Sequence, residues 1–333
     1  MKTLDRRKFL KQSAIVMAAS IAGRAVGRAP LVSRNFSAQG LDHPFFAGAQ
    51  KPDVIAHRGG NGHWPGETMF AMRRAVEVGV DVLEMDVFLT ASGTDDLGRF
   101  EAPELVLMHD EDVGMTTEGN RRVYEYKLHE ITELHADYRW IPNHTKTSRR
   151  RIGTGIFSKQ DVRVPTLEKV LKEFPKTRMV IEMKKVTKAP VGYSPVQHLV
   201  ELIELYEAHK RVLVASFEPK FMDAFRKALP TVATSLTISG EDTHRVLKQL
   251  LGSPGAAQGP VALQIPWEAF YLPLNEPILR KLQRRFAIHP WTVNKEWEMQ
   301  KMISFGVDGI ITDYPCTLLD ALHRRPPQSR PCS

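Results

Sequence analysis

The chain has 333 residues, 42% of them hydrophobic, and a formal net charge of +8. Residues 1–29 contain seven Lys or Arg and one Asp, so the remainder carries only about +2, and a nucleic-acid-binding role, which normally concentrates basic charge on one face, loses its main support and is not expected. Two cysteines exclude a disulfide framework and a cysteine-rich zinc site, while the length and hydrophobic content suffice for one large core.

The N-terminus resembles a twin-arginine export signal. The segment DRRKFLK from Asp5 precedes an apolar stretch from about Ala14 to Ala22, roughly half the ~20 residues that a membrane span requires. We expect residues 1–29 to be the signal, residues 30–52 an N-terminal extension, and the protein to be exported by the twin-arginine translocation machinery to the periplasm or outside the cell. No transmembrane segment is expected. The alternative is an uncleaved basic amphipathic tail.

Three short clusters stand where β-strands are expected to end: IAHRGG from Ile55, VLEMDV from Val82 and VLMHD from Val106. Together they supply two imidazoles, a guanidinium and two carboxylates, which belong to His57, Arg58, Glu84, Asp86 and His109. We expect these side chains to meet at one mouth. Such an inventory is what metal-assisted hydrolysis of a phosphodiester needs.

Glu84 and Asp86 lie two positions apart, so both side chains face the same side of the expected strand. Two carboxylates on an otherwise apolar strand need positive charge between them, because burial of unpaired like charges is costly. A set of oxygen ligands favours a hard divalent cation, Mg²⁺ or Ca²⁺, over zinc. The alternative is a structural salt-bridge network with an Arg or Lys partner.

A third carboxylate appears in the apolar run VIEMKK from Val180, where Glu182 and Lys184 share one face of a strand. Three acids from separate runs with one adjacent ammonium fit a cation and a phosphate held side by side. The alternative is a Glu-Lys pair on a solvated edge strand, which the apolar neighbours of Glu182 disfavour.

Strand-like runs alternate with amphipathic helical segments, and this pattern predicts an α/β TIM (β/α)8 barrel. Helices are expected at residues 68–78, 166–174, 196–208, 220–229, 276–286 and 296–305. Strand ends are expected near His57, Val87, His109, Lys184, Ser216, Leu236, Ile265, Trp291 and Thr312. Since a TIM barrel holds eight strands, the run near Ile265 is the one we would omit. The barrel should span residues 53–322, somewhat irregularly, with an insertion at about 110–163 over the C-terminal mouth and a flexible tail at 323–333.

Eight motifs resemble those of the glycerophosphodiester phosphodiesterase family and occur in family order over about residues 53 to 320. They are HRGGNGHWPGET from His57, GVDVLEMDVFLT from Gly79, VLMHD from Val106, VPTLEKVL from Val164, IEMK from Ile181, ASFEP from Ala215, WTVN from Trp291 and GVDGIITDYP from Gly306. Each motif is weak alone, and their ordered coincidence is strong.

The resemblance implies a role for each candidate side chain. Glu84, Asp86 and Glu182 would bind one divalent cation. His57 and His109 would be the general acid/base pair, while Arg58 would stabilise the reacting phosphate and, with Lys184, hold its oxygens. Phe217 and Trp291 would wall the substrate cleft, with core packing as the alternative for both.

One position departs from the family pattern. The family usually carries Pro-Glu-Asn-Thr where this chain has Pro65, Gly66, Glu67 and Thr68. On a helix, one residue turns a side chain by about 100°, so Glu67 is not expected to replace the missing Glu in space. We therefore leave Glu67 out of the predicted site.

The leading functional hypothesis is metal-dependent hydrolysis of a water-soluble glycerophosphodiester to an alcohol and sn-glycerol 3-phosphate. A lysophospholipase D acting on single-chain lysophospholipids is the first alternative, and it would need Phe88, Tyr138, Trp140 and Trp267 to cluster near the mouth. A catalytically inactive phosphodiester-binding barrel is the second alternative. The retention of both histidines and all three carboxylates argues against inactivity.

Overall fold

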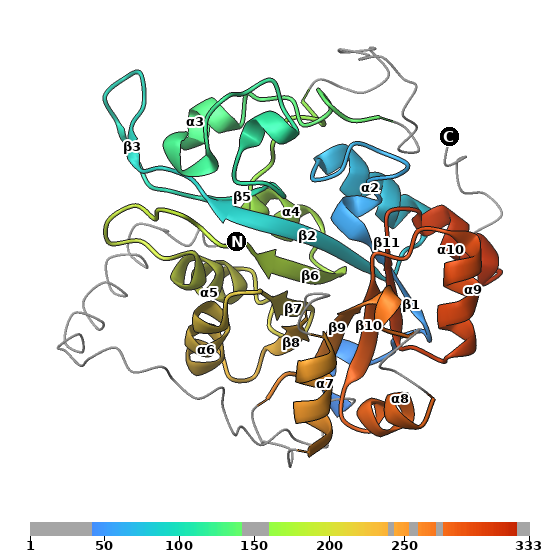
Figure 1. The fold of residues 1–333 in the computed structure, drawn as a ribbon. Coiled ribbons are helices and arrows are strands. Elements are labelled where there is room, and N and C mark those ends of the chain that lie inside the picture. Colours follow the sequence, from blue (N-terminus) through green and yellow to red (C-terminus); the bar gives the residue numbers. More distant parts are fainter. Residues whose placement is uncertain (1–41, 142–159, 239–242, 253–258, 271–275, 325–333) are drawn as a thin grey trace. The chain divides into compact units, whose positions relative to one another are not determined.

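Eight parallel strands form a nearly closed barrel with helices around them (Figure 1). The computed structural model describes residues 42–141, 160–238, 243–252, 259–270 and 276–324. Around the barrel the strands follow the order β10, β9, β8, β7, β6, β2, β1, β11. Their bounds are β1 Asp53–Ala56, β2 Val82–Leu89, β6 Arg178–Met183, β7 Val212–Ala215, β8 Ala233–Thr237, β9 Ala262–Pro266, β10 Ala287–Trp291 and β11 Gly309–Thr312. The predicted TIM-barrel fold is confirmed.

Two backbone hydrogen bonds join the flanking strands β10 and β11, which end the ordered path. Asp308 N donates to Ile288 O at 3.1 Å, and Val293 N donates to Ile311 O at 2.9 Å. The remaining neighbours pair in parallel register, for example Asp86 opposite Glu182 across β2 and β6. Parallel pairing places the carboxyl ends of all eight strands at one mouth.

The helices that cover the barrel are α2 Met69–Val78, α4 Leu167–Glu173, α5 Pro195–Leu205, α6 Pro219–Ala228, α7 Thr243–Gly252, α8 Glu276–Gln283, α9 Glu296–Ser304 and α10 Pro315–Ala321. Their ends follow from local chemistry. Thr68 Oγ1 accepts a hydrogen bond from Ala71 N at 3.0 Å and caps α2, which ends at Gly79 with a φ of 90°. Proline is the first residue of α5, α6 and α10, where its missing N–H costs nothing.

The barrel interior is filled by one apolar side chain from each strand. These side chains are Ile55, Val82, Val180, Leu213, Ala233, Ala262, Ala287 and Ile311, and Phe45 from the 3-10 helix η2 Pro44–Phe46 packs with them. A larger apolar cluster lies between the strands and the helices. The polar side chains at the mouth therefore stand on a packed floor.

The strand that ends near His109 lies outside the barrel. This strand, β5 Leu105–Leu107, pairs antiparallel with β2. The connection from β2 to β5 contains only the short hairpin strands β3 Gly93–Thr94 and β4 Phe100–Glu101, and without a crossover helix two neighbouring strands run antiparallel. Omitting the run near Ile265 was wrong, because that run is the barrel strand β9.

The described part of the predicted insertion, residues 110–141 and 160–163, contains η4 Val113–Met115, η5 Val123–Glu125 and α3 Leu128–Ile131. Its apolar side chains form a third cluster with Phe88 of β2 and Val106 of β5. Phe88 is thus a core residue beneath the insertion.

Several predicted regions lie outside the described residues. They are the export signal at 1–29, most of the extension at 30–52, residues 142–159 of the insertion, and all but the first two residues of the tail at 323–333. Arg324, the last described residue, bonds Pro52 O at 3.0 Å and lies 2.7 Å from Asp81 Oδ1. Cys316 at the start of α10 is disulfide-bonded. None of the described helices is both long and apolar enough to cross a membrane.

Candidate active site

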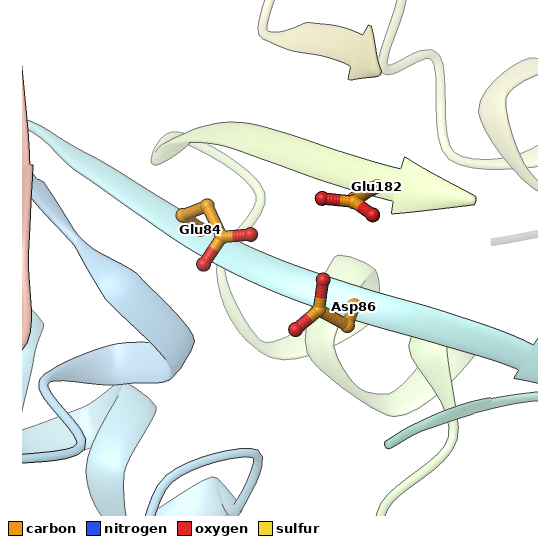
Figure 2. Close-up of side chains that lie close together, drawn as sticks. All are labelled: Glu84, Asp86 and Glu182. Carbon is orange, nitrogen blue, oxygen red and sulfur yellow. The ribbon is translucent and has the colours of Figure 1, made fainter. Parts of the chain in front are cut away.

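Three carboxylates converge at the mouth of the barrel. Figure 2 shows Glu84 and Asp86 on β2 and Glu182 on β6 turned toward a common space. One oxygen from each of the three lies within 4.8 Å of the others. The alternation along β2 and the pairing of Asp86 with Glu182 produce this arrangement. The convergence predicted from the sequence is therefore present.

Two basic side chains contact the carboxylates. Lys184 Nζ lies 3.0 Å from Asp86 Oδ1 and 2.8 Å from Glu182 Oε1, and Arg58 Nε lies 3.2 Å from Asp86 Oδ2. The backbone N–H of Arg58 donates to Glu84 Oε2 at 2.9 Å. The salt-bridge network considered as an alternative is thus present in part, beside the convergent acids.

The basic side chains leave part of the acidic site uncompensated. Asp86 Oδ2 and Arg58 Nε are close, yet both are buried and neither has a hydrogen-bond partner among the described residues. Burial and the charge of Asp86 raise the pKa of Glu84 well above its usual range, and the same two causes raise that of Glu182. Burial alone would also raise the pKa of Asp86, but Lys184 and Arg58 hold it below its usual range. A divalent cation fits this oxygen set.

Glu67 also reaches the acidic site, contrary to the interpretation of the sequence. It is buried and has a φ of 57°, and its Oε1 accepts a hydrogen bond from Asp86 N at 2.9 Å. Glu67 precedes the cap of α2, so the helical rotation assumed for it does not apply; its left-handed backbone turns the side chain back toward β2. A Cβ at Gly66 would lie 2.6 Å from Asn61 Oδ1, which explains the glycine there.

A sharp turn at the end of β1 places His57 and Arg58 at the mouth. Arg58 has a φ of 53° and Gly59 a φ of 77°. A Cβ on Gly59 would lie 2.9 Å from Ala71 Cβ of α2, so the turn packs closely against that helix. Both His57 and Arg58 line the same cavity as the three carboxylates.

His57 is held by Asp313, which immediately follows β11. The distance from His57 Nδ1 to Asp313 Oδ1 is 2.7 Å, and Asn294 Nδ2 donates to Asp313 Oδ2 at 2.7 Å. Burial would raise the pKa of Asp313, but His57 and Asn294 lower it to about 2. Burial lowers the pKa of His57, and Asp313 opposes this effect. An ionised Asp313 accepts the Nδ1 proton, which leaves Nε2 of a neutral His57 as a proton acceptor.

His109 lies on the chain just after β5, and its Nδ1 is 3.1 Å from Asp110 Oδ1. Its side chain is about one-third exposed, whereas that of His57 is more deeply placed. His109 and Lys184 line the cavity together with His57. The structure thus brings both predicted histidines to the predicted acids.

Phe217 and Trp291 line the cavity as well, with ring centroids 6.0 Å apart. The cavity lining is completed by Thr237, Gln264, Thr292 and Ile311. The four aromatic residues suggested for a lipid-binding wall, Phe88, Tyr138, Trp140 and Trp267, are absent from its described lining. Trp267 instead contacts Trp297, with ring centroids 5.7 Å apart.

The sequence interpretation missed Asp313, Asn294 and Glu67 as parts of the site. Asp313 and Asn294 belong to the motifs TDYP and WTVN, which were recognised without a role for these two side chains. Glu67 carried no usable signal, because its position depends on a left-handed backbone that is uncommon for a residue other than glycine.

The chain is similar to known proteins both in sequence and in fold. The family model described as the glycerophosphoryl diester phosphodiesterase family matches residues 57–317. A glycerophosphodiester phosphodiesterase from Caldanaerobacter subterraneus subsp. tengcongensis is 28% identical over 276 residues, which cover 81% of this chain and 98% of the relative. The protein named lysophospholipase D GDPD1 from Mus musculus is 24% identical over 298 residues, which cover 81% of this chain and 85% of the relative.

Solved structures share the fold. A glycerophosphodiester phosphodiesterase from Agrobacterium tumefaciens superposes with a TM-score of 0.59 at 19% identity, covering 81% of this chain and 99% of that chain. An Oleispira antarctica phosphodiesterase, solved in complex with the product sn-glycerol-3-phosphate, gives a TM-score of 0.59 at 22% identity and covers 82% of this chain and 97% of that chain.

Proposed function

The chain belongs to the glycerophosphoryl diester phosphodiesterase family and is a phosphoric diester hydrolase, and we propose that it hydrolyses glycerophosphodiesters to an alcohol and sn-glycerol 3-phosphate. The observation that carries the proposal is a single cavity lined by three convergent carboxylates, two histidines, an arginine and a lysine. Such a cavity provides both charge neutralisation and proton transfer, which are the two requirements of phosphodiester hydrolysis.

Glu84, Asp86 and Glu182 would hold one divalent cation, Mg²⁺ or Ca²⁺. When bound, the cation neutralises charge on the phosphate and orients it. Arg58 and Lys184 already lie beside the acidic site, 3.2 Å and 3.0 Å from Asp86 oxygens. In the proposal these two side chains turn to the phosphate oxygens, where their charge stabilises the transition state.

His57 and His109 would divide the proton transfers. The neutral His57, with Nδ1 held by Asp313, removes the proton from the attacking oxygen through Nε2 as that oxygen bonds to phosphorus. His109, protonated, gives its proton to the leaving alcohol oxygen as the P–O bond breaks. The pair together transfers one proton from the nucleophile and one proton to the alcohol, so the charge of the reacting phosphate is conserved.

Phe217 and Trp291 would bind substrate at the cavity wall, supported by their place in its lining. A lysophospholipid would need an apolar surface for its acyl chain, and the aromatic residues considered for this purpose do not line the cavity described here. Because the mouse relative is named a lysophospholipase D, a lysophospholipid should be included among the substrates tested.

The test is a product assay on purified protein with Mg²⁺ and Ca²⁺ supplied separately. We expect sn-glycerol 3-phosphate to be released from glycerophosphocholine or glycerophosphoethanolamine with at least one of the ions, and excess chelator to abolish the release. Full activity in excess chelator would contradict the cation site. Preferential cleavage of lysophosphatidylcholine would contradict the water-soluble substrate and identify a single-chain lipid as the substrate instead.

We also propose export by the twin-arginine machinery to the periplasm or outside the cell, with residues 1–29 as the signal and residues 30–52 as an extension. The paired arginines Arg6 and Arg7 and the short apolar stretch that follows support the route.

A further inference from the structure

The cavity at the barrel mouth has one charged side and one neutral side. The charged side chains belong to β1, β2, β6 and the segments just after them, including Arg58, Glu84, Glu182 and Lys184. Thr237, Gln264 and Trp291 belong to β8, β9 and β10. In the order of the eight strands β9 lies four places from β2 and β10 four places from β6, so in a nearly closed barrel the neutral side faces the charged side across the mouth.

The neutral side carries two buried donors without partners. Gln264 is only 4% exposed, and its Nε2 has no hydrogen-bond partner among the described residues. Trp291 Nε1 is a buried atom and also has no hydrogen-bond partner among them. The other end of the Gln264 amide is held, because its Oε1 accepts a hydrogen bond from Thr237 Oγ1 at 3.3 Å. Buried N–H groups are almost always paired, so two such groups in the lining of one cavity indicate a bound molecule with oxygen acceptors.

The chemistry of the donors selects the part of the substrate that they bind. The neutral side offers N–H groups without a countercharge, so it suits the oxygen of an alcohol better than a cationic headgroup. An acyl chain has no acceptor and would leave both donors unpaired. With the phosphate held at the charged side, the hydroxyl groups of the glycerol are the uncharged acceptors that the substrate carries next to the phosphate.

Resting on the proposed function, we infer that Gln264 Nε2 and Trp291 Nε1 bind the hydroxyl oxygens of the glycerol moiety and thereby make the enzyme selective for glycerol phosphates. Gln264 is the specificity-determining residue, since its amide is oriented for this contact. Thr237 is a positioning residue that holds the amide through Oε1. The variable alcohol of the diester is left to the open part of the mouth.

The experiment compares two ligands of equal charge, sn-glycerol 3-phosphate and n-propyl phosphate, which has the same three-carbon chain without hydroxyl groups. Their dissociation constants are measured by calorimetry on the full protein with a saturating divalent cation. The variants are Gln264→Met, which keeps the side-chain length, and Gln197→Met as a matched control. Gln197 lies on α5, where its Nε2 bonds Glu201 at 3.1 Å, outside the described cavity lining.

We expect the parent protein to bind sn-glycerol 3-phosphate about tenfold more tightly than n-propyl phosphate, the effect of one to two hydrogen bonds. Gln264→Met should remove most of this preference by weakening only the glycerol ligand, and Gln197→Met should leave it unchanged. Thr237→Val should reduce the same preference by about two- to threefold, because the amide loses its anchor.

An unchanged preference in Gln264→Met would overturn the inference, and so would an equal loss of affinity for both ligands. Parent protein that cleaves glycerophosphodiesters but binds the two ligands equally would overturn the glycerol subsite alone. Parent protein that neither binds these ligands nor cleaves a glycerophosphodiester would instead overturn the proposed function.

Discussion

Asp313 gives His57 a defined tautomer and a defined orientation. The Asp313 carboxylate lies 2.7 Å from His57 Nδ1. Asn294 holds Asp313 through two hydrogen bonds: Asn294 Nδ2 donates to Asp313 Oδ2, and Asn294 Oδ1 accepts from Asp313 N at 3.0 Å. Burial lowers the pKa of His57, so the imidazole is neutral at pH 7 and Nε2 can accept a proton. A proton acceptor at the mouth is therefore built from three side chains.

We predict that Asp313→Asn lowers kcat/KM by about 100-fold or more, because the preferred tautomer is lost. In the parent, kcat/KM should fall with acidification only below pH 6.5, since the lowered pKa of His57 keeps the base neutral to lower pH. Removal of the Asp313 charge lowers that pKa further, so the acid limb of the variant should shift to still lower pH. The measurement is kcat/KM from pH 4.5 to 8.

Asp308→Asn is the matched control, because Asp308 precedes β11 at the opposite end of the barrel and bonds Lys51 Nζ at 2.9 Å. Its kcat/KM and acid limb should match those of the parent. An Asp313→Asn variant with the rate and acid limb of the parent would show that the carboxylate does not orient the base.

At the scale of elements, two loops at the mouth are joined by one side chain. Glu111, two residues after His109, accepts hydrogen bonds from Thr187 N at 2.6 Å and from Thr187 Oγ1 at 2.7 Å. Thr187 lies three residues after Lys184. β5 lies outside the parallel barrel, so it has no parallel neighbour that would fix the segment after it. The link between Glu111 and Thr187 therefore holds the segment that carries His109 against the segment that follows Lys184.

We predict that Glu111→Ala lowers kcat/KM by about tenfold, since small displacements of catalytic groups are costly. Affinity for the divalent cation should change little, because the carboxylates lie on β2 and β6. Arg122→Ala is the control: it removes another contact of Glu111, at 3.2 Å from Oε2, and leaves Thr187 bonded. Equal kinetics for the two variants would show that the link to Thr187 has no effect on catalysis.

At the scale of the whole barrel, a packed apolar floor carries a mouth divided into a charged and a neutral half. The eight apolar interior side chains come one from each strand, and polar groups of the mouth lie two or four residues further toward the carboxyl ends, on the same face. Trp140 Nε1 donates to Asn61 O at 2.6 Å, which ties the described end of the insertion to the segment after β1. The fold thus positions charged side chains and neutral polar side chains on opposite sides of one cavity.

The sequence was sufficient wherever local periodicity decides the geometry. Alternation along β2 placed Glu84 and Asp86 together, and the clusters at strand ends located His57 and Glu182. It was insufficient where a long-range partner or a rare backbone decides. The antiparallel pairing of β5, the left-handed Glu67 and the buried Nε2 of Gln264, which has no hydrogen-bond partner among the described residues, each depend on neighbours distant in the chain.

The central claim is that Glu84, Asp86 and Glu182 hold a divalent cation, rather than only neutralising Lys184 and Arg58. The most direct measurement is the dissociation constant of Mg²⁺ and Ca²⁺ for the parent, Glu182→Ala and His109→Ala, with turnover measured in parallel. Glu182→Ala should lose at least about tenfold in affinity together with activity, whereas His109→Ala should keep the parent affinity and lose activity. A parent that binds neither ion, or a Glu182→Ala variant with parent affinity, would contradict the claim.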